Sequence, residues 1–216
     1  MKGEDLDDLL SEQISYYRAR APEYESGALH LPGGEELEAA LEAFRPSGDV
    51  LELACGPGGW TELILRYAES ITAVDASPEM LSIASSRVGR DPRVRFVIAD
   101  LFDWNPDERY DVVFFGFWLS HVPLERFDSF WSTVKECLAP NGRVFFVDDA
   151  YRTPDELIEG EASATILRRL DDGTPFRAVK VPHTAVDLEE RLSALGWTIE
   201  VTQTAGPFFW GSGSPG

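Results

Sequence analysis

Apolar residues recur every three or four positions in the first part of the chain, a spacing typical of amphipathic helices. From Leu6 to Tyr17 this spacing predicts a helix, and Pro22 predicts its end. A second helical pattern follows Gly34. We therefore expect residues 1–47 to form an N-terminal helical segment.

From residue 48 to residue 150 the pattern changes to short apolar strands that alternate with helices. The predicted strands are 49–54, 71–74, 94–99, 110–115 and 143–147, and the predicted helices are 59–67, a helix from Ser77, and 124–138. Ser77 is a plausible N-cap with Pro78 at the first helical position. The run over 110–115 is almost continuously apolar, as in a strand buried on both faces. This alternation predicts an α/β fold with a doubly wound, mostly parallel sheet.

Residues 151–216 have more hairpin character. Asp171-Asp172-Gly173 separates two apolar runs and predicts a hairpin over 164–181, which could be a lid over substrate or an oligomer contact. A helix ending at Gly196 and two last strands, 197–202 and 208–210, are also predicted. We expect this part to complete the same domain as residues 48–150 and to give the sheet an antiparallel edge hairpin. The terminal stretch 211–216 is rich in Gly and Ser and is predicted to be flexible.

The net charge of the chain argues against nucleic acids and anionic membranes as partners. The 216 residues include 38 Asp plus Glu against 19 Lys plus Arg, a net charge of -19. Such a chain lacks the basic face that nucleic-acid backbones and anionic membranes attract. There is no apolar run of membrane-spanning length and no signal-peptide core, and Cys55 and Cys137 form no spacing pattern. We expect a reduced, cytoplasmic protein that binds neither nucleic acid nor membrane.

A glycine-rich turn follows the first strand of the predicted sheet. Glycines there let a ligand approach the backbone closely, and an acid after the second strand, Asp75, is suited to ribose hydroxyls. The dinucleotide fingerprint fits Gly56 and Gly58 but fails at Thr61, and no phosphate-loop Gly-Lys-Ser/Thr follows. A ligand with a ribose and no phosphates therefore fits this turn better than a nicotinamide dinucleotide.

The ordered set Glu52-x-x-x-Gly56-x-Gly58-Gly59, Asp75 and Ala99-Asp100 resembles the class I S-adenosylmethionine-dependent methyltransferases of the small-molecule type. The resemblance covers residues 48–149 well and the rest loosely. It implies a Rossmann-like seven-stranded sheet, S-adenosylmethionine as cofactor, and methyl transfer to an O or N atom of a small molecule by in-line displacement. It also implies that the N-terminal helix closes over the cofactor as a lid, because similar Tyr-Tyr-x-x-Arg-Ala segments precede the domain in that family.

The same resemblance implies a set of cofactor-binding residues. Asp75 is expected on the ribose hydroxyls, Asp100 on the adenine amino group, and Tyr16 with Arg20 on the carboxylate, although the last two could be ordinary helix residues. The full set is Tyr16, Arg20, Glu52, Ala54, Gly56, Gly58, Asp75, Ala76, Met80, Asp100, Leu101, Phe102 and Phe117.

Residues after the fourth and fifth strands are candidates for the chemistry. His121 could act as a general base toward a hydroxyl or ammonium acceptor, or simply pack at a helix start. Trp118 is a candidate for an apolar substrate pocket. Asp148 and Asp149 end the fifth strand, and they could bind a cationic substrate group or cap the next segment; Asp148 is the one included in the predicted site. No acid follows the fourth strand, so no metal site is expected. His30 and His183 are weaker site candidates.

Two other functions remain open at this point. A nicotinamide-dependent reductase is disfavoured by Thr61 and by the lack of a Tyr-x-x-x-Lys pair. A non-enzymatic ligand-binding module with the same fold is the second, because fold does not fix function. The pattern is compatible with a monomer or a homodimer.

Overall fold

The computed structural model describes residues 3–24, 32–106, 108–158, 160 and 163–216, so His30 lies outside the described residues. Seven strands form one sheet in the order β3-β2-β1-β4-β5-β9-β8. The strands are β1 (Gly48–Leu53), β2 (Ala68–Asp75), β3 (Val94–Ile98), β4 (Tyr110–Gly116), β5 (Leu138–Asp149), β8 (Trp197–Gln203) and β9 (Phe208–Pro215). The first five run parallel, and β9 pairs antiparallel with both β5 and β8. The predicted fold class is confirmed, with β8 and β9 as its antiparallel edge pair.

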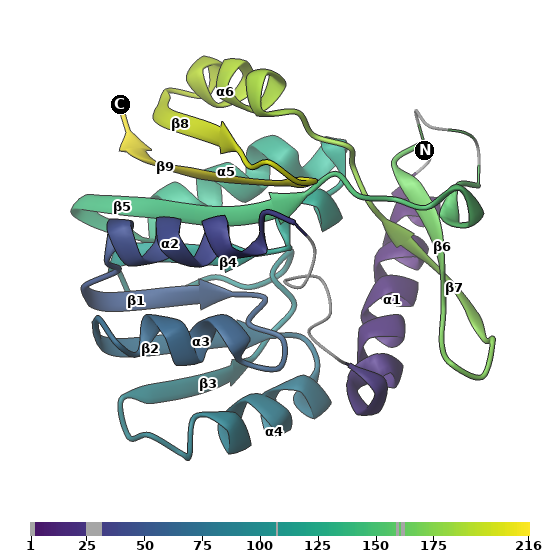
Figure 1. Cartoon of the computed structure of the whole chain (residues 1–216), viewed down its shortest axis with the longest axis horizontal. Helices are drawn as coiled ribbons and strands as arrows, with labels where there is room; N and C mark the ends of the chain where they lie inside the picture. The colour runs from purple at the N-terminus through teal and green to yellow at the C-terminus, as the bar shows by residue number, and fades with distance from the viewer. Residues whose placement is uncertain (1–2, 25–31, 107, 159, 161–162) are drawn as a thin grey trace.

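Helices cover both faces of this sheet (Figure 1). The α-helices are α1 (Gly3–Arg20), α2 (Gly34–Phe44), α3 (Gly59–Ile64), α4 (Pro78–Arg87), α5 (Phe127–Cys137) and α6 (Ala185–Ala194). Short 3-10 helices are η1 (Ala21–Glu23), η3 (Leu119–His121), η4 (Leu124–Arg126) and η5 (Pro154–Glu156). In the part of the chain that the structure describes, none of the helices is long and apolar enough to cross a membrane.

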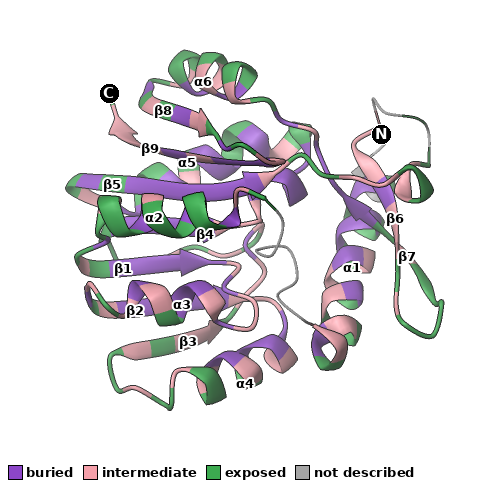
Figure 2. Cartoon of the chain, viewed as in Figure 1, coloured by how far each residue is buried: buried purple, intermediate pink, exposed green. Residues whose placement is uncertain are grey.

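Side chains that alternate along β4 build the two halves of the core. Phe114 packs with residues of α2 and α3, whereas Phe115 packs with α5 and α6, and both are fully buried. The alternation follows from the two-residue repeat of a strand, and Figure 2 shows the inner strands buried while the outward side of α2 is exposed. Burying one such ring contributes on the order of 2 kcal/mol. The prediction of a strand buried on both faces is confirmed.

The expected flexible tail is instead a strand of the sheet, which corrects the sequence prediction. Residues 211–215 belong to β9, which lies between β5 and β8. A β-carbon on Gly211 would lie 2.3 Å from the ring of Phe146, and one on Gly213 would lie 2.0 Å from the carbonyl oxygen of Thr198. The small residues are therefore there for close packing, a role that composition cannot distinguish from a linker.

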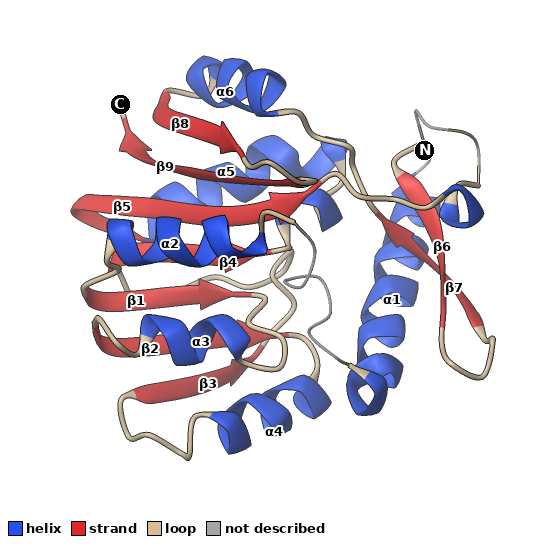
Figure 3. Cartoon of the chain, viewed as in Figure 1, coloured by secondary structure: helices blue, strands red, loops and turns tan. Residues whose placement is uncertain are grey.

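The 164–181 hairpin forms a separate two-stranded sheet of β6 (Thr165–Arg169) and β7 (Pro175–Val179). It stands apart from the main sheet and beside α1 (Figure 3). Leu9 and Leu10 of α1 cluster with Val179 and Val181, and the Tyr16 ring lies 5.8 Å from the Phe176 ring. Helix α1 and this hairpin therefore form one unit, which lies beyond the carboxyl ends of the parallel strands (Figure 1).

Candidate active site

A cavity of about 570 Å³ lies between the carboxyl ends of β1, β2 and β4 and the unit formed by α1 and the hairpin. This volume is typical of a small-molecule site, and its position is the one at which open parallel sheets bind ligands. Twelve of the predicted site residues line it: Tyr16, Arg20, Glu52, Ala54, Gly56, Asp75, Ala76, Met80, Leu101, Phe117, Trp118 and His121. The structure therefore places these twelve predicted residues, which come from α1 and from the sheet, around one cavity.

The glycine turn between β1 and α3 opens toward this cavity. Gly56 has a positive φ of 52°, and a β-carbon there would have no heavy atom within 4 Å. Gly58 also has a positive φ, of 78°, but it faces away, since its β-carbon would lie 2.8 Å from that of Ala84. Gly56 therefore leaves room for a ligand against the backbone, while Gly58 allows α3 and α4 to pack closely.

Asp75 joins the end of β2 to the glycine turn. Its Oδ2 accepts a hydrogen bond from the Gly56 N–H at 2.8 Å, and its Oδ1 accepts one from the Ser77 N–H at 2.9 Å. Burial raises the pKa of this carboxyl, and the backbone hydrogen bonds oppose that rise. Ser77 in turn caps α4 by accepting from the Met80 N–H, as predicted. The carboxylate keeps acceptor capacity at the cavity wall, which suits ribose hydroxyls.

Glu52 is a buried acid under the same turn. Its Oε2 accepts a hydrogen bond from the hydroxyl of Thr61 at 2.6 Å. Burial raises the pKa of Glu52 to about 8, and the bond to Thr61 only partly offsets that effect. The residue that breaks the dinucleotide fingerprint is therefore the partner of this acid. A cationic group bound nearby would favour the ionised form.

Tyr16 and Arg20 lie together on the cavity side of α1. The guanidinium of Arg20 is 6.0 Å from the centre of the Tyr16 ring. Arg20 forms no ion pair with any residue that the structure describes. A cavity-lining cation that pairs with no acid among the described residues is suited to a ligand carboxylate.

Four predicted site residues do not line the cavity in the structure. Gly58 faces α4, and Phe102 packs its ring 5.5 Å from that of Trp118. The carboxylate of Asp100 accepts a hydrogen bond from the Phe102 N–H at 3.0 Å. Asp148 is fully buried behind the wall, because its side chain accepts from the N–H and hydroxyl of Ser120 at 2.7 and 2.8 Å. The neighbouring Asp149 reaches the cavity in its place.

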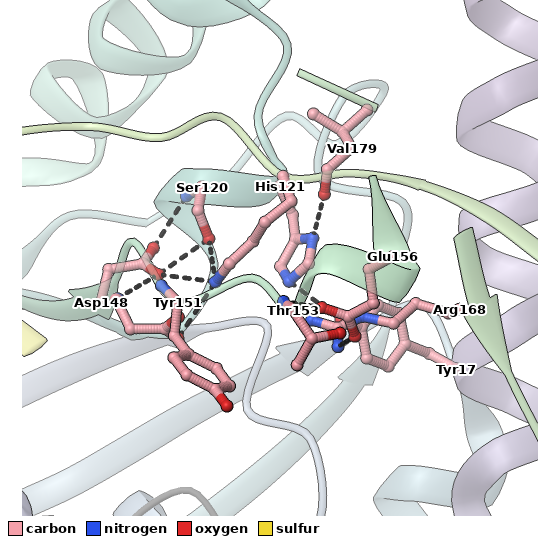
Figure 4. Close-up of polar contacts among 11 residues, drawn as sticks. Tyr17, Ser120, His121, Asp148, Tyr151, Thr153, Glu156, Arg168 and Val179 are labelled. Carbon is pink, nitrogen blue, oxygen red and sulfur yellow. Dashed lines mark hydrogen bonds and ion pairs between the residues drawn. The ribbon is translucent and has the colours of Figure 1, made fainter. Parts of the chain in front are cut away.

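His121 lies at the other end of the cavity, in η3, with both ring nitrogens engaged. Nδ1 lies 2.5 Å from the carbonyl oxygen of Val179, so it carries the proton and donates. Nε2 then accepts a hydrogen bond from the hydroxyl of Tyr17 at 2.9 Å. Burial lowers the pKa of His121 well below its usual value, and the nearby Lys180 and Arg168 lower it further. The imidazole is therefore neutral, between Tyr17 and Val179 (Figure 4).

Three cavity-lining cations were missed by the sequence analysis: Arg87, beside the glycine turn, and Lys180 and Arg168, near His121. Lys180 is only 2% exposed, and its ammonium lies 3.0 Å from the Ser120 hydroxyl and 3.0 Å from Asp149 Oδ2. Arg168 of β6 forms an ion pair with Glu156 of η5 and faces the same space (Figure 4). The signal for Lys180 was present, since it interrupts the apolar run from Ala178 to Val181. A lysine there is buried only if it is paired.

The cavity thus has two chemically different ends. The cofactor end contains the glycine turn, Asp75, Glu52 and Arg20, which together fit a ligand with a ribose, a carboxylate and cationic groups. The other end contains two cations, a neutral imidazole and Trp118, whose buried indole N–H has no partner among the described residues. The residues that the structure describes include no group of three His, Cys, Asp or Glu that could hold a metal ion.

Comparisons with known proteins agree with this arrangement. Residues 50–142 match the family model described as "Methyltransferase domain". The chain is 32% identical over 183 residues to a trans-aconitate 2-methyltransferase of Streptomyces avermitilis, covering 80% of this chain and 66% of that protein. It is 31% identical over 190 residues to the corresponding enzyme of Methylobacterium nodulans, covering 78% and 69%. The chain therefore spans about two thirds of the length of these relatives.

Solved structures give the same result over almost the whole chain. The structure described as "DhpI-SAM-HEP complex" is 42% identical, covers 96% of this chain and 98% of that one, and has a TM-score of 0.83. The "DhpI-SAH complex structure" is 42% identical with a TM-score of 0.81. The described residues at the cofactor end fit S-adenosylmethionine for the reasons given above. The chain belongs to the family of class I S-adenosylmethionine-dependent methyltransferases.

Proposed function

We propose that this protein transfers a methyl group from S-adenosylmethionine to an ionised oxygen of a small oxygen acid. The observation that carries the proposal is that Arg168 and Lys180 line the same cavity as the glycine turn. Arginine and lysine bind carboxylates and phosphoryl groups through charge-assisted hydrogen bonds. Relatives support an acidic acceptor: both of those described above are named for trans-aconitate, and another, from Ilyobacter polytropus, is a malonyl-[acyl-carrier protein] O-methyltransferase, 32% identical over 82 residues.

The size of the cavity supports a small acceptor. A volume of about 570 Å³ is of the order that holds a single drug-sized ligand. The cofactor would take most of that space, which leaves little for the second molecule. The acceptor that fits is one with few non-hydrogen atoms beyond its acidic group.

The chain contributes position and electrostatics rather than covalent chemistry. When bound, S-adenosylmethionine supplies an electrophilic methyl group on its sulfonium. Arg20, Asp75 and Gly56 would hold the cofactor, while Arg168 and Lys180 orient the acceptor oxygen for in-line displacement. Because an oxygen acid is ionised near neutral pH, its oxygen needs no base. In this reaction His121 holds Tyr17 and the hairpin in place.

A hydroxyl acceptor is the second candidate, and one contact favours it. The Tyr17 hydroxyl donates to the lone pair on Nε2 of His121, so an acceptor hydroxyl could pass its proton through Tyr17 to that nitrogen. The base role predicted for His121 belongs to this reaction. A rate that falls steeply as His121 becomes protonated would separate it from methylation of an ionised acid.

Substitution of the two cations tests the proposal. Arg168→Gln and Lys180→Met should raise the KM for an acid acceptor about tenfold or more, the size of one charge-assisted hydrogen bond, and leave the calorimetric Kd for S-adenosylmethionine within about twofold. Arg177→Gln is the matched control, since Arg177 lies on the same hairpin, pairs with Glu12, and does not line the cavity. Unchanged KM values in both variants would contradict the proposal, as would better turnover of neutral hydroxyl compounds.

We further propose that the protein acts in the cytoplasm, without nucleic acid, as a monomer or homodimer. The free, buried Cys55 and Cys137 suit a reducing compartment. The net charge of -19 disfavours a nucleic-acid surface. Light scattering after gel filtration measures the oligomeric state, and a gel shift with duplex DNA tests the nucleic-acid prediction.

A further inference from the structure

We call the end of the cavity that contains Arg168, Lys180 and His121 the acceptor end. Both of its cations already form ion pairs with carboxylates. Glu156 pairs with Arg168, and the side chains are only 16% and 26% exposed. The Lys180 ammonium lies 3.0 Å from Asp149 and 3.6 Å from Asp148. Among the described residues this group has two cations and three acids. The stretches outside the described part contain one Lys or Arg, Lys2, and one histidine, His30.

Glu156 cannot easily swing away from Arg168. Its Oε2 accepts a hydrogen bond from the Thr153 N–H at 2.9 Å as part of the capping box of η5, and its Oε1 faces the guanidinium. The two oxygens of one carboxylate thus tie the loop after β5 to β6 of the hairpin. An incoming anion therefore meets an Arg168 whose charge is already compensated.

The balance of charge limits what the site can accept. Excess charge at a largely buried site is costly, because neighbouring charges interact strongly where water is excluded. The cations can orient one ionised group by hydrogen bonds, but they supply no surplus positive charge for a second or third. By contrast, trans-aconitate, after which the two relatives described above are named, is a tricarboxylic acid.

We infer that the acceptor is a small acid with a single ionised group, and that Glu156 sets this preference by compensating the charge of Arg168. The inference rests on the proposed function and narrows its substrate class. It makes Glu156 a specificity-determining residue that acts through Arg168 without needing to touch the acceptor. If Glu156 had only a structural role, its substitution would lower kcat/KM for all acceptors equally.

Matched acids test the inference. Butyrate and succinate, and hexanoate and adipate, differ by one carboxylate at equal carbon number. For each pair, kcat/KM with S-adenosylmethionine and the calorimetric Kd in saturating S-adenosylhomocysteine are measured. The wild type should favour the monoacid, and Glu156→Gln should shift the ratio toward the diacid by roughly tenfold, as expected for one unit charge several ångströms away. In an Arg168→Gln background the same substitution should shift it much less.

Glu12→Gln is the control, because Glu12 pairs with Arg177 of the same hairpin away from the cavity, and it should leave the ratio unchanged. A wild-type preference for diacids, or an equal loss for both acids in Glu156→Gln, would overturn the inference while leaving acid methylation intact. If the wild type neither binds nor methylates any of the four acids, the proposed function fails for carboxylic acids, and this inference fails with it.

Discussion

The hydroxyl of Tyr17 lies 2.9 Å from Nε2 of His121, and this contact ties α1 to the loop that follows β4. Gln13, one turn earlier in α1, connects the helix to the hairpin as well, because its Oε1 accepts a hydrogen bond from the Val179 N–H at 2.9 Å. His121 donates to the carbonyl of the same Val179. The acceptor end of the cavity therefore takes its shape from three segments that are far apart in the sequence.

Tyr17→Phe should remove the hydrogen bond between α1 and His121 and slow the reaction. The substitution leaves Nε2 of His121 as a buried acceptor without a partner, which costs about 1–3 kcal/mol. We expect a comparable loss in the free energy of unfolding and a drop of about tenfold in kcat/KM for the acceptor, with the cofactor Kd nearly unchanged. Tyr110→Phe is the control, because its hydroxyl bonds Glu108 at the opposite end of the sheet. An acceptor kcat/KM equal in both variants would contradict the role given to Tyr17.

His183 should make the stability depend on pH below neutrality. Burial lowers the pKa of His183 from 6.5 to about 4. Below pH 6.5 the unfolded chain binds a proton that the folded chain does not, so stability falls as the pH drops from 6.5 toward 4. The loss attributable to this group is on the order of 3 kcal/mol. Urea unfolding of the wild type and His183→Gln across this range measures it, and parallel pH curves would contradict the prediction.

Glu52 should release a proton when the cofactor binds. Its pKa of about 8 means that the free protein holds this carboxyl mostly protonated at pH 7. The family resemblance implies that Glu52 lies against the methionine and ribose parts of the cofactor, and the cationic methionine part would favour the carboxylate. Affinity should therefore rise with pH up to about 8. Calorimetry at pH 7 in phosphate and in Tris measures the proton released, and Glu52→Gln should abolish it. An enthalpy independent of buffer in the wild type would exclude this coupling.

Gly213→Ala should destabilise the fold although it lies near the C-terminus. The added β-carbon would lie 2.0 Å from the backbone carbonyl oxygen of Thr198, which cannot move without disturbing the pairing of β8 and β9. Overpacking of this kind costs about 1–3 kcal/mol. Ser214→Ala, in the same strand, is the control and should change the unfolding midpoint little. Equal midpoints for the two variants would support the flexible tail that the sequence suggested.

Periodicity predicted the framework because it depends on local patterns. The strand over 110–115, the cap at Ser77 and the glycine turn with Asp75 are each encoded within a few residues, and the structure has all of them. The apolar alternation of strands and helices then limits the topology to a parallel sheet with ligands at one edge. Most of the cofactor end follows from those two facts.

The acceptor end was harder to predict because it is assembled by long-range contacts. Arg168 and Lys180 come from a hairpin that carries no motif, and their partners Glu156 and Asp149 are visible only once η5 and β7 are placed. Sequence alone cannot decide between Asp148 and Asp149, because the pattern at a strand end does not reveal which of two adjacent side chains faces the cavity. The prediction of a flexible tail was wrong for a different reason. Gly and Ser are common both in closely packed strands and in flexible linkers, so composition does not distinguish the two.

The central claim is that this methyltransferase acts on an anionic oxygen of a small acid. The direct measurement is transfer from S-adenosylmethionine carrying a deuterated methyl group to a panel of small carboxylic acids, phosphorus oxygen acids and neutral alcohols of matched size, read by mass spectrometry. We expect the wild type to form a labelled methyl ester of an acid, and Arg168→Gln to form far less of it. Label found only on the hydroxyl of an alcohol, at a rate independent of Arg168, would contradict methylation of an acid.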